Sequence, residues 1–405
     1  MCHEVEGSKL FSFGAIADVQ YADCDDGWNW NCTVPRYFRG ALGQLRKAVD
    51  FWLGQESHSF VLQLGDLIDG RNAPDGSEAA LATIKGELQR LMDVLPLGVL
   101  NSLGNHELYN FPKERWAQEL DCSSEAKAVK LHPARESLSF LRADGEHSVL
   151  FPLEKGSAGG AAGEAGGGVA DPDARPRYYY SFCPCSAYRF IALDTFDVNA
   201  IRERPVEHEA ERSSGGDDGG LRDRDGDSAF RSASMMLEEK NPNPEKNSSY
   251  QMEGLDQRFV QYNGGLGPEQ LRWFEDQLAE ASRLGQRVVA FGHIPIHPSA
   301  TDEKALMWNY DEVLAVIHKF DCMALYMSGH RHQNGYHRDA QGVHYVTLAA
   351  ALETPAPQAR WGDAWTQENA TLLLRMTFAS LDVYEDRVEL RGHGVITSRT
   401  MLLLS

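Results

Sequence analysis

The sequence predicts an α/β fold in which a largely parallel sheet is covered by helices and is followed by a second, mixed or antiparallel sheet. In the first hundred residues, short apolar runs alternate with longer segments whose apolar residues recur at helical spacing. After Gly342, strand-like runs follow one another without such a segment. Strands that alternate with helices favour parallel pairing, because each crossover helix packs on a face of the sheet.

The first half of the chain is expected to fold as strand, helix, strand, helix, strand. In order, these elements cover residues 11–17, 37–57, 60–64, 77–95 and 97–103. Further on, strands are expected at 188–193, 287–291 and 323–327, with helices at 268–284 and 311–320. Pro268 suits the first turn of its helix, where a missing N–H costs nothing. The last strands are expected at 343–348, 377–384 and 387–391.

Two segments are predicted to be mobile insertions in a single domain of residues 1–405. Residues 156–175 are rich in Gly and Ala, and residues 203–227 are crowded with charged residues and Gly. Neither segment can bury enough apolar surface to offset its ordering entropy.

Composition limits the class of partner and the compartment. The net charge of −20 opposes non-specific binding to nucleic acid or anionic lipid. No run of about 18 apolar residues predicts a membrane span. Seven cysteines without a secretory signal indicate reduced thiols in the cytoplasm. We therefore expect a cytoplasmic monomer that acts on a small molecule.

Five short polar motifs each begin where an apolar strand is expected to end. They are Asp18-Val19-Gln20, Gly65-Asp66-Leu67-Ile68-Asp69, Gly104-Asn105-His106-Glu107, Gly292-His293 and Gly329-His330-Arg331-His332. Strand ends in open α/β sheets are where loops converge into sites. Each motif alone is also compatible with a plain turn or a structural histidine. Five in order, each after a strand, favour one joint site.

The residue types in these motifs are those that divalent cations bind. Carboxylate, imidazole and amide oxygen suit Mn, Fe or Zn, and neighbouring glycines allow close backbone approach. Two cations about 4 Å apart, bridged by one carboxylate, can activate a water molecule for attack on phosphorus. The sequence therefore predicts a two-metal hydrolase of phosphate esters or anhydrides.

With these motifs the chain resembles the calcineurin-like metallophosphoesterases, whose pattern is D-x-H, G-D-x-x-D, G-N-H-[DE], G-H and G-H-x-H. The motifs span residues 18–332, and only the first departs from the pattern, with Gln20 in place of His. The resemblance implies a four-layer α/β/β/α sandwich. It also implies one ion held by Asp18, Gln20, Asp66 and His332, and a second held by Asp66, Asn105, His293 and His330.

The same resemblance implies roles around the two ions. His106 would stabilise the leaving-group oxygen or protonate it. Asp69 and Glu107 would orient ligands, although Asp69 is equally compatible with a purely structural role. The amide of Gln20 is a harder ligand than imidazole, which shifts the expected preference from Zn towards Mn or Mg.

Longer runs resemble one subfamily in particular, the manganese-dependent ADP-ribose/CDP-alcohol diphosphatases. They are LFSFG at 10–14, ADVQ at 17–20, VLQLGD at 61–66, GNHELYNF at 104–111, FVQYNGG at 259–265 and WNY at 308–310. This resemblance implies hydrolysis of a pyrophosphate bond, releasing a nucleoside monophosphate and a phosphorylated product. The cofactor would be two divalent ions, Mn²⁺ before Mg²⁺, Fe or Zn²⁺. The insertions at 156–175 and 203–227 depart from the family pattern.

Aromatic residues near the motifs are candidates for binding the substrate, because aromatic faces hold nucleobases. Trp30 is the candidate stacking residue, and Tyr109, Tyr262 and Asn263 are further candidates. Trp28 and Trp30 are equally compatible with covering the edge of the core. Two alternatives remain open for the whole chain: another phosphoesterase, acting on phosphomonoesters, cyclic nucleotides or phosphoproteins, and a non-catalytic scaffold.

Overall fold

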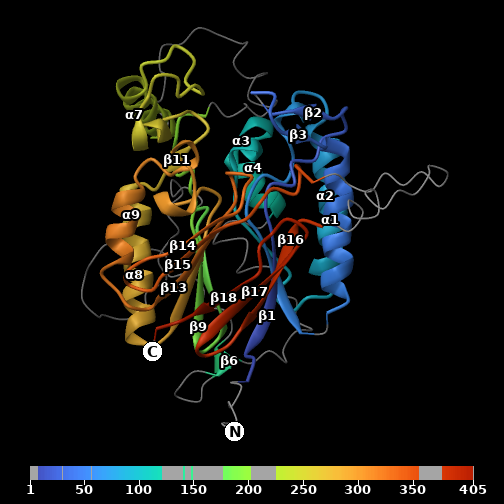
Figure 1. Ribbon diagram of the computed structural model, residues 1–405, viewed down its shortest axis with the longest axis vertical. Coiled ribbons are helices and arrows are strands. Elements are labelled where there is room, and N and C mark those ends of the chain that lie inside the picture. The colour runs from blue at the N-terminus through green and yellow to red at the C-terminus, as the bar shows by residue number, and fades with distance from the viewer. Residues whose placement is uncertain are drawn as a thin grey trace, which may run out of the picture.

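Two six-stranded sheets face each other in the computed structural model, and helices cover the outer face of each (Figure 1). The structure describes residues 8–29, 31–55, 57–120, 140–141, 147–148, 177–201, 225–354 and 376–404. In Figure 1, α1 and α2 lie on one side of the sheets and α8 and α9 on the other. The four-layer α/β/β/α arrangement that the resemblance implied is confirmed.

The first sheet has the strand order β18-β17-β16-β1-β4-β5. Strands β1 (Phe11–Ile16), β4 (His58–Gln63) and β5 (Val99–Asn101) run parallel, and helices α1 (Phe38–Leu53) and α2 (Ser77–Met92) connect them. The predicted strand–helix alternation of the first half is confirmed. Strand β16 (Phe378–Val383) joins β1 antiparallel, and β17 (Arg387–His393) and β18 (Arg399–Leu402) continue the sheet.

The second sheet has the order β14-β15-β13-β12-β9-β8. Strands β9 (Tyr188–Ala192), β12 (Arg287–Phe291), β13 (Met323–Ser328) and β15 (His344–Thr347) are parallel. Edge strands β8 (Tyr180–Cys185) and β14 (Gly335–Arg338) are antiparallel to their neighbours. Helices α8 (Pro268–Arg283) and α9 (Tyr310–Ile317) pack on this sheet.

The prediction that the strands after Gly342 form a sheet of their own is wrong. Strand β15 belongs to the second sheet, whereas β16 and β17 extend the first. The early parallel strands likewise belong to one sheet and the later ones to the other. Apolar patterning shows which side chains are buried, but pairing depends on where each strand can bury both faces in the layered fold.

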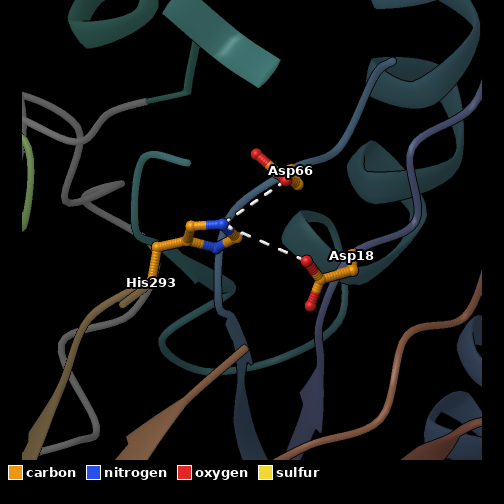
Figure 2. A group of neighbouring side chains, drawn as sticks. All are labelled: Asp18, Asp66 and His293. Atoms are coloured by element: carbon orange, nitrogen blue, oxygen red, sulfur yellow. Dashed lines mark ion pairs between the residues drawn. The ribbon is translucent and has the colours of Figure 1, made fainter. Parts of the chain in front are cut away.

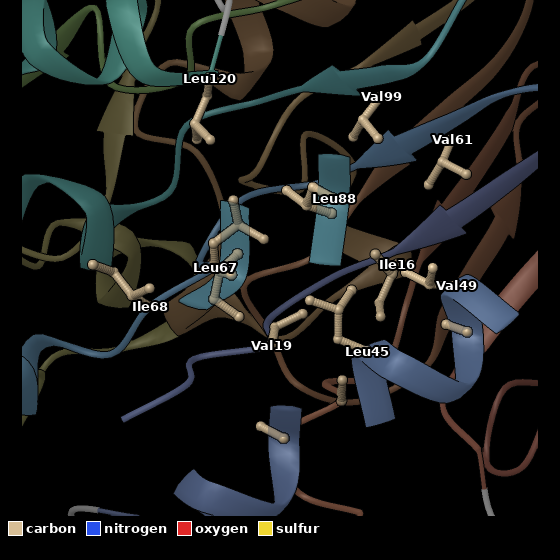
Figure 3. Packing of buried hydrophobic residues seen from close by; sticks show 14 of the residues in the cluster. Ile16, Val19, Leu45, Val49, Val61, Leu67, Ile68, Leu88, Val99 and Leu120 are labelled. Atoms are coloured by element: carbon tan, nitrogen blue, oxygen red, sulfur yellow. The ribbon is translucent and has the colours of Figure 1, made fainter. Parts of the chain in front are cut away.

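The core explains why the central strands are apolar throughout. All six residues of β1 are buried, because helices cover one face and the opposite sheet covers the other. Between the sheets, the ring of Phe13 stacks on Phe60 at 5.0 Å and meets Phe190 edge-on at 5.4 Å. On the helix side, Figure 3 shows aliphatic residues of β1, β4 and β5 packed against α1 and α2.

Smaller elements surround the ends of the sheets. They are helices α3 (Asn105–Asn110), α4 (Lys113–Leu120) and α7 (Asp225–Lys240), short strands β2 (Gly27–Trp28), β3 (Pro35–Arg36), β6 (Phe140–Leu141), β7 (His147–Ser148), β10 (Val198–Asn199) and β11 (Gly264–Gly265), and 3-10 turns η1 (Gly70–Asn72), η3 (Gly254–Arg258), η4 (Pro298–Ala300) and η5 (Glu303–Ala305). The sequence patterns did not predict α4 or α7. Within the described ranges, no helix combines the length and apolarity needed to cross a membrane.

The two predicted insertions fall mostly outside the described residues. Residues 156–175 and 203–224 lie there entirely. Residues 225–227, which were assigned to the second mobile loop, instead form the start of α7. That boundary was therefore placed too late, because the Asp and Gly residues there resemble the preceding loop in composition.

Candidate metal centre

The five polar motifs meet at one place between the two sheets. Asp18 and Gln20 follow β1, Asp66 follows β4, Asn105 opens α3 after β5, His293 follows β12, and His330 and His332 follow β13. Nε2 of His293 lies 3.4 Å from Oδ2 of Asp66 and 4.0 Å from Oδ1 of Asp18. Figure 2 shows the His293 ring facing both carboxylates. These three side chains are close enough to ligate one cation.

His332 and His330 complete the ring of donors. Nε2 of His332 lies 3.5 Å from Oδ1 of Asp18, and Nδ1 of His330 lies 3.0 Å from Nε2 of His293. Loops from both sheets therefore supply the centre, because the carboxyl ends of the parallel strands of each sheet point to the same region.

The backbone at this centre is strained. Seven non-glycine residues in the described part of the chain have positive φ, and five of them are predicted ligands. These five are Asp18 (φ 52°), Gln20 (45°), Asp66 (60°), His330 (70°) and His332 (67°). A left-handed conformation costs a non-glycine residue about 1–3 kcal/mol and persists only where the surrounding structure enforces it. Such concentrated strain indicates a functional site.

Three motif glycines are required because their neighbours approach too closely for a side chain. A Cβ on Gly104 would lie 2.0 Å from Oδ1 of Asp66, and one on Gly329 would lie 2.5 Å from Oδ2 of Asp18. A Cβ on Gly65 would lie 2.3 Å from Nδ1 of His293. The glycines let the ligand loops pack against one another.

Hydrogen bonds on the far side of three imidazoles fix which nitrogen faces the centre. Nδ1 of His293 lies 2.7 Å from the carbonyl oxygen of Leu64. Nδ1 of His332 lies 2.8 Å from Oε1 of Glu353, and Nε2 of His330 lies 2.6 Å from Oδ1 of Asn263. Each contact has an oxygen acceptor, so the imidazole nitrogen there carries the hydrogen. When a ring is neutral, its opposite nitrogen has a lone pair that is directed to the centre and can bind a cation.

Two buried amide oxygens at the centre have no hydrogen-bond partner among the residues that the structure describes. They are Oε1 of Gln20 and Oδ1 of Asn105, both predicted ligands. In the structure the amide nitrogen of Gln20, rather than its oxygen, faces Asp66, donating to Oδ2 at 2.8 Å. A half-turn of the amide exchanges two atoms of similar size and brings the oxygen inward. Lone-pair donors gathered around unsatisfied oxygens fit a pair of divalent cations.

The electrostatics of the buried carboxylates and imidazoles depend on one another. Burial raises the pKa of Asp18. Burial would also raise the pKa of Asp66, but His293 and His106 outweigh burial and lower it. Burial would lower the pKa of His293, but Asp66 and Asp18 raise it to about 9. Bound dications would dominate this charge balance.

His106 lies at the edge of the donor ring and faces the cavity. Its Nε2 is 4.0 Å from Oδ2 of Asp66, and its Nδ1 is 3.1 Å from Oδ2 of Asp69. Burial would lower the pKa of His106, but Asp66 and Asp69 outweigh burial and raise it. The backbone N–H of Gly70 also donates to Nδ1 at 3.0 Å, which leaves Nε2 as the nitrogen that can donate a hydrogen bond to a leaving oxygen. The other oxygen of Asp69 accepts the backbone N–H of Arg71, so Asp69 also caps a turn.

Glu107 lies beneath the Asp66 turn and does not face the cavity. Its carboxylate accepts the backbone N–H groups of Asp66, Leu67 and Gly104 at 2.6–2.8 Å. Burial and the Asp66 carboxylate raise the pKa of Glu107 to about 7. The side chain thus fixes the loop that carries Asp66 and ties it to the loop that carries Asn105.

A cavity of about 770 Å³ opens over the donor ring. Tyr109 and Tyr262, both predicted to bind substrate, line it, and so do His106 and the predicted ligands Gln20, Asp66, Asn105, His330 and His332. Tyr109 also accepts a hydrogen bond from the Asn105 amide at 3.3 Å. Trp30 lies outside the described residues. Trp28 is 55% exposed and does not line the cavity.

Asn263, which was predicted to bind substrate, has another role. The residue is fully buried and is not part of the cavity wall. Its amide nitrogen contacts the carbonyl oxygens of Arg258, Lys304 and Leu306, and its oxygen contacts His330. In this structure the hydrogen-bonding groups of Asn263 are engaged, and the residue contacts a candidate ligand from outside the cavity wall. The sequence could not reveal this, because Asn263 adjoins Tyr262, which does face the cavity.

The sequence did not identify Glu353 or the cations of the cavity wall. Glu353 contacts His332, and Arg36, Lys304 and Arg331 line the cavity. Glu353 follows β15 as the ligands follow their strands, but no Gly or His motif marks it. Arg36 ends the short strand β3, and Lys304 lies in η5. Their proximity to the centre depends on tertiary structure alone.

Comparison with known proteins identifies the family. The chain is 34% identical over 383 residues to a manganese-dependent ADP-ribose/CDP-alcohol diphosphatase of Arabidopsis thaliana, covering 95% of this chain and 94% of the relative. It is 32% identical over 401 residues to the human protein of the same description, covering 97% and 93%. The chain belongs to this family.

A solved structure from the zebrafish supports the family assignment. The structure is described as a dimetal phosphatase from Danio rerio, and it superposes with a TM-score of 0.69 at 29% identity. The alignment covers 98% of this chain and all of that one. No family model matches the chain. Because the alignment with the zebrafish structure covers nearly all of both chains, the likeness extends over the whole metallophosphoesterase fold.

Proposed function

We propose that this protein is a manganese-dependent hydrolase that cleaves the pyrophosphate bond of ADP-ribose and CDP-alcohols to a nucleoside monophosphate and a phosphorylated product. The observation that carries this proposal is the convergence of carboxylates and imidazoles beneath the cavity, beside two buried amide side chains whose oxygens have no hydrogen-bond partner among the described residues. Family members at 31–34% identity are named for this activity and this metal.

In this proposal, one Mn²⁺ is held by Asp18, Gln20, Asp66 and His332, and the other by Asp66, Asn105, His293 and His330. Asp66 would be the shared ligand, because its carboxylate lies 3.4 Å from His293 and also contacts the Gln20 amide. When bound, the two cations activate water and neutralise the charge of the attacked phosphate. Asp69 and Glu107 orient His106 and the Asp66 turn.

His106 is the proposed group that acts on the leaving oxygen. It is the imidazole of the centre that lines the cavity without being a proposed metal ligand. The backbone N–H of Gly70 donates to Nδ1 of the ring at 3.0 Å, so Nε2 is the nitrogen that would carry a proton for the leaving phosphate. Asp69 acts through His106 and needs no contact with substrate.

The cavity suits an anionic substrate with a nucleoside. Arg36, Lys304 and Arg331 are cations of its wall, which also holds the carboxylates of Asp66, Glu245, Asp302 and Glu353. Bound cations would add the positive charge that an anionic substrate needs. Tyr109 and Tyr262 offer aromatic surface, and Trp30 remains a proposed stacking residue. A volume of about 770 Å³ is within the range for ligands the size of a nucleoside diphosphate.

The proposal is tested with purified protein and a panel of substrates. ADP-ribose, CDP-choline, a phosphomonoester, a cyclic nucleotide and a phosphopeptide are each incubated with Mn²⁺, Mg²⁺ or Zn²⁺. We expect AMP from ADP-ribose and CMP from CDP-choline, fastest with Mn²⁺, and little turnover of the other three. Preferred turnover of the phosphopeptide or the phosphomonoester would replace the proposal with another phosphoesterase activity. No turnover of any compound would favour a scaffold.

We also propose that the protein acts in the cytoplasm as a monomer, without binding nucleic acid or membrane. Five cysteines fall within the described residues and all are free thiols, as a reducing compartment favours. The net charge of −20 opposes binding to polyanions. Sedimentation and cell fractionation test these points, and a stable dimer or a membrane-bound pool would contradict them.

A further inference from the structure

The two histidines of the Gly329–His332 loop are oriented by different partners. His332 is contacted at Nδ1 by the carboxylate of Glu353, which leaves Nε2 facing Asp18. His330 is contacted at Nε2 by the amide oxygen of Asn263, which leaves Nδ1 facing His293. One proposed ion therefore has a ligand supported by a negative charge, and the other has a ligand supported by a neutral amide.

Glu353 is rigidly placed for this contact. It lies on the segment after β15, and backbone hydrogen bonds connect this segment to the loop that carries His332 and to the loop that carries Asp18. Ala350 N–H donates to the carbonyl of His332 at 3.2 Å, and Leu352 N–H donates to the carbonyl of Asp18 at 3.0 Å. The side chains of Glu353 and His332 are 14% and 10% exposed. The carboxylate therefore contributes a fixed charge in a largely buried place.

The contact with His332 is the principal one made by Glu353. The same oxygen lies 4.0 Å from Nε of Arg36, which is beyond hydrogen-bond distance, and this nitrogen has no hydrogen-bond partner in the described part of the chain. Arg36 therefore forms only a long ion pair with Glu353, whereas His332 makes the close contact. A carboxylate behind a ligating imidazole fixes the ring and makes it a stronger electron donor.

We propose that Glu353 is a positioning residue that orients His332 for the ion held with Asp18 and Gln20, and that it makes this ion the more tightly bound of the two. Asn263 orients His330 for the other ion and supplies no charge. This inference rests on the proposed metal centre. It adds that the two ions bind with unequal affinity and that each has its own orienting residue.

The test measures Mn²⁺ binding directly, without substrate. Metal-free protein is titrated with Mn²⁺, and the free ion is followed by electron paramagnetic resonance. We expect two unequal sites in the wild-type protein. Glu353→Ala should weaken the tighter site by about 10- to 100-fold, the usual effect of removing such a partner. Glu353→Gln keeps a hydrogen-bond acceptor but no charge, so the Mn²⁺ affinity of its tighter site should lie between that of Glu353→Ala and that of wild type. Asn263→Ala should weaken the other site.

Controls separate positioning from loss of structure. Arg36→Gln should leave both Mn²⁺ affinities within about threefold, because Arg36 makes no hydrogen bond to Glu353. Glu389→Gln, on β17, is the matched control far from the centre. The melting temperature of metal-free Glu353→Gln should equal that of wild type within about 2 °C, whereas the added stability at saturating Mn²⁺ should shrink.

The outcomes are distinct from those of the substrate panel. Two Mn²⁺ sites that Glu353→Ala leaves unchanged would overturn the inference while the proposed activity stands. The inference also fails if Arg36→Gln reproduces the loss, or if Glu353→Ala alters only the KM for ADP-ribose. A wild-type protein with two unequal sites, one weakened by Glu353→Ala, but with no hydrolysis of ADP-ribose would support the inference and end the proposed activity.

Discussion

The backbone N–H of His106 donates a hydrogen bond of 2.9 Å to Oδ1 of Asp66. The proposed bridging carboxylate thus helps to position the residue that is proposed to act on the leaving group. The loop after β4 and the start of α3 form one connected unit, because Glu107 adds hydrogen bonds to the backbone on both sides.

His106→Ala should lower kcat for ADP-ribose by about 10²- to 10⁴-fold, the usual contribution of a positioned proton donor. The backbone hydrogen bond to Asp66 survives this substitution, so the metal content should remain two Mn²⁺ per chain. Steady-state kinetics and metal analysis on the same preparation check both points. Asp69→Asn is the companion variant, expected to lower kcat less. An unchanged kcat in His106→Ala would remove His106 from the mechanism.

Gln20→His should change the order of metals that support activity. Imidazole is a softer donor than an amide oxygen, so Zn²⁺ should gain relative to Mn²⁺. The substitution acts at the centre, because the Gln20 amide lies 3.1 Å from Nε2 of His332 and 2.8 Å from Oδ2 of Asp66. The measurement is the ratio of activities with Zn²⁺, Mg²⁺ and Mn²⁺. Identical ratios in the two proteins would contradict the role assigned to Gln20.

Gly104→Ala should abolish metal binding and destabilise the protein by about 1–3 kcal/mol, the usual cost of overpacking. The added Cβ would lie 2.0 Å from Oδ1 of Asp66 and 2.6 Å from its backbone nitrogen. Gly86 is the matched control, because it lies within α2 and has nothing within 4 Å of an added Cβ. Gly86→Ala should stabilise the protein by about 0.5–1 kcal/mol. Chemical denaturation of the two metal-free variants measures both changes in the free energy of unfolding.

His58 should make the protein less stable in mild acid. Burial lowers the pKa of His58 to about 4, with Lys9 and Arg391 contributing in the same direction. The unfolded chain, with a histidine pKa of about 6.5, binds the proton first. Stability should therefore be lost as the pH falls from about 6.5 to 4, by at most about 1.4 kcal/mol per pH unit for one proton. Above a pH of about 6.5 this group should have no effect.

His58→Gln should remove this part of the acid sensitivity. Denaturant unfolding of metal-free protein at several pH values between about 4 and 8 gives the difference between wild type and variant. The difference should change only below about pH 6.5, because only there does His58 take up a proton on unfolding. If the difference in unfolding free energy between wild type and variant is constant across the pH range, His58 has the same pKa in the folded and unfolded states.

Apolar patterning sufficed to predict the strands that carry the ligands, because those strands are buried and mostly apolar. The same patterning did not predict which strands pair with one another. Strand β15 and strand β16 look alike as sequences, yet they join different sheets. The short helix α4 also escaped prediction, since two turns give too little periodicity to recognise.

The candidate site likewise contains residues that the sequence predicted and residues that it did not. Asp18, Asp66, His293 and His332 stand out because ligand-type residues that follow an apolar strand are unusual, and Gly65 and Gly292 next to two of them mark tight turns. Glu353 and Arg36 have no such mark. The sequence did not show that Asn263 contacts His330, because neighbouring residues in an irregular segment can face opposite directions: Tyr262 lines the cavity and Asn263 does not.

The sequence by itself determined the family of this protein, the order of its ligand loops and the donor type at each predicted ligand position, because these are local properties of short motifs. Only the tertiary structure decided which ring nitrogen of each histidine faces the centre and which side chain holds it there. Those choices depend on hydrogen bonds between residues up to 229 positions apart, as between His293 and Leu64, and no local pattern encodes such a distance.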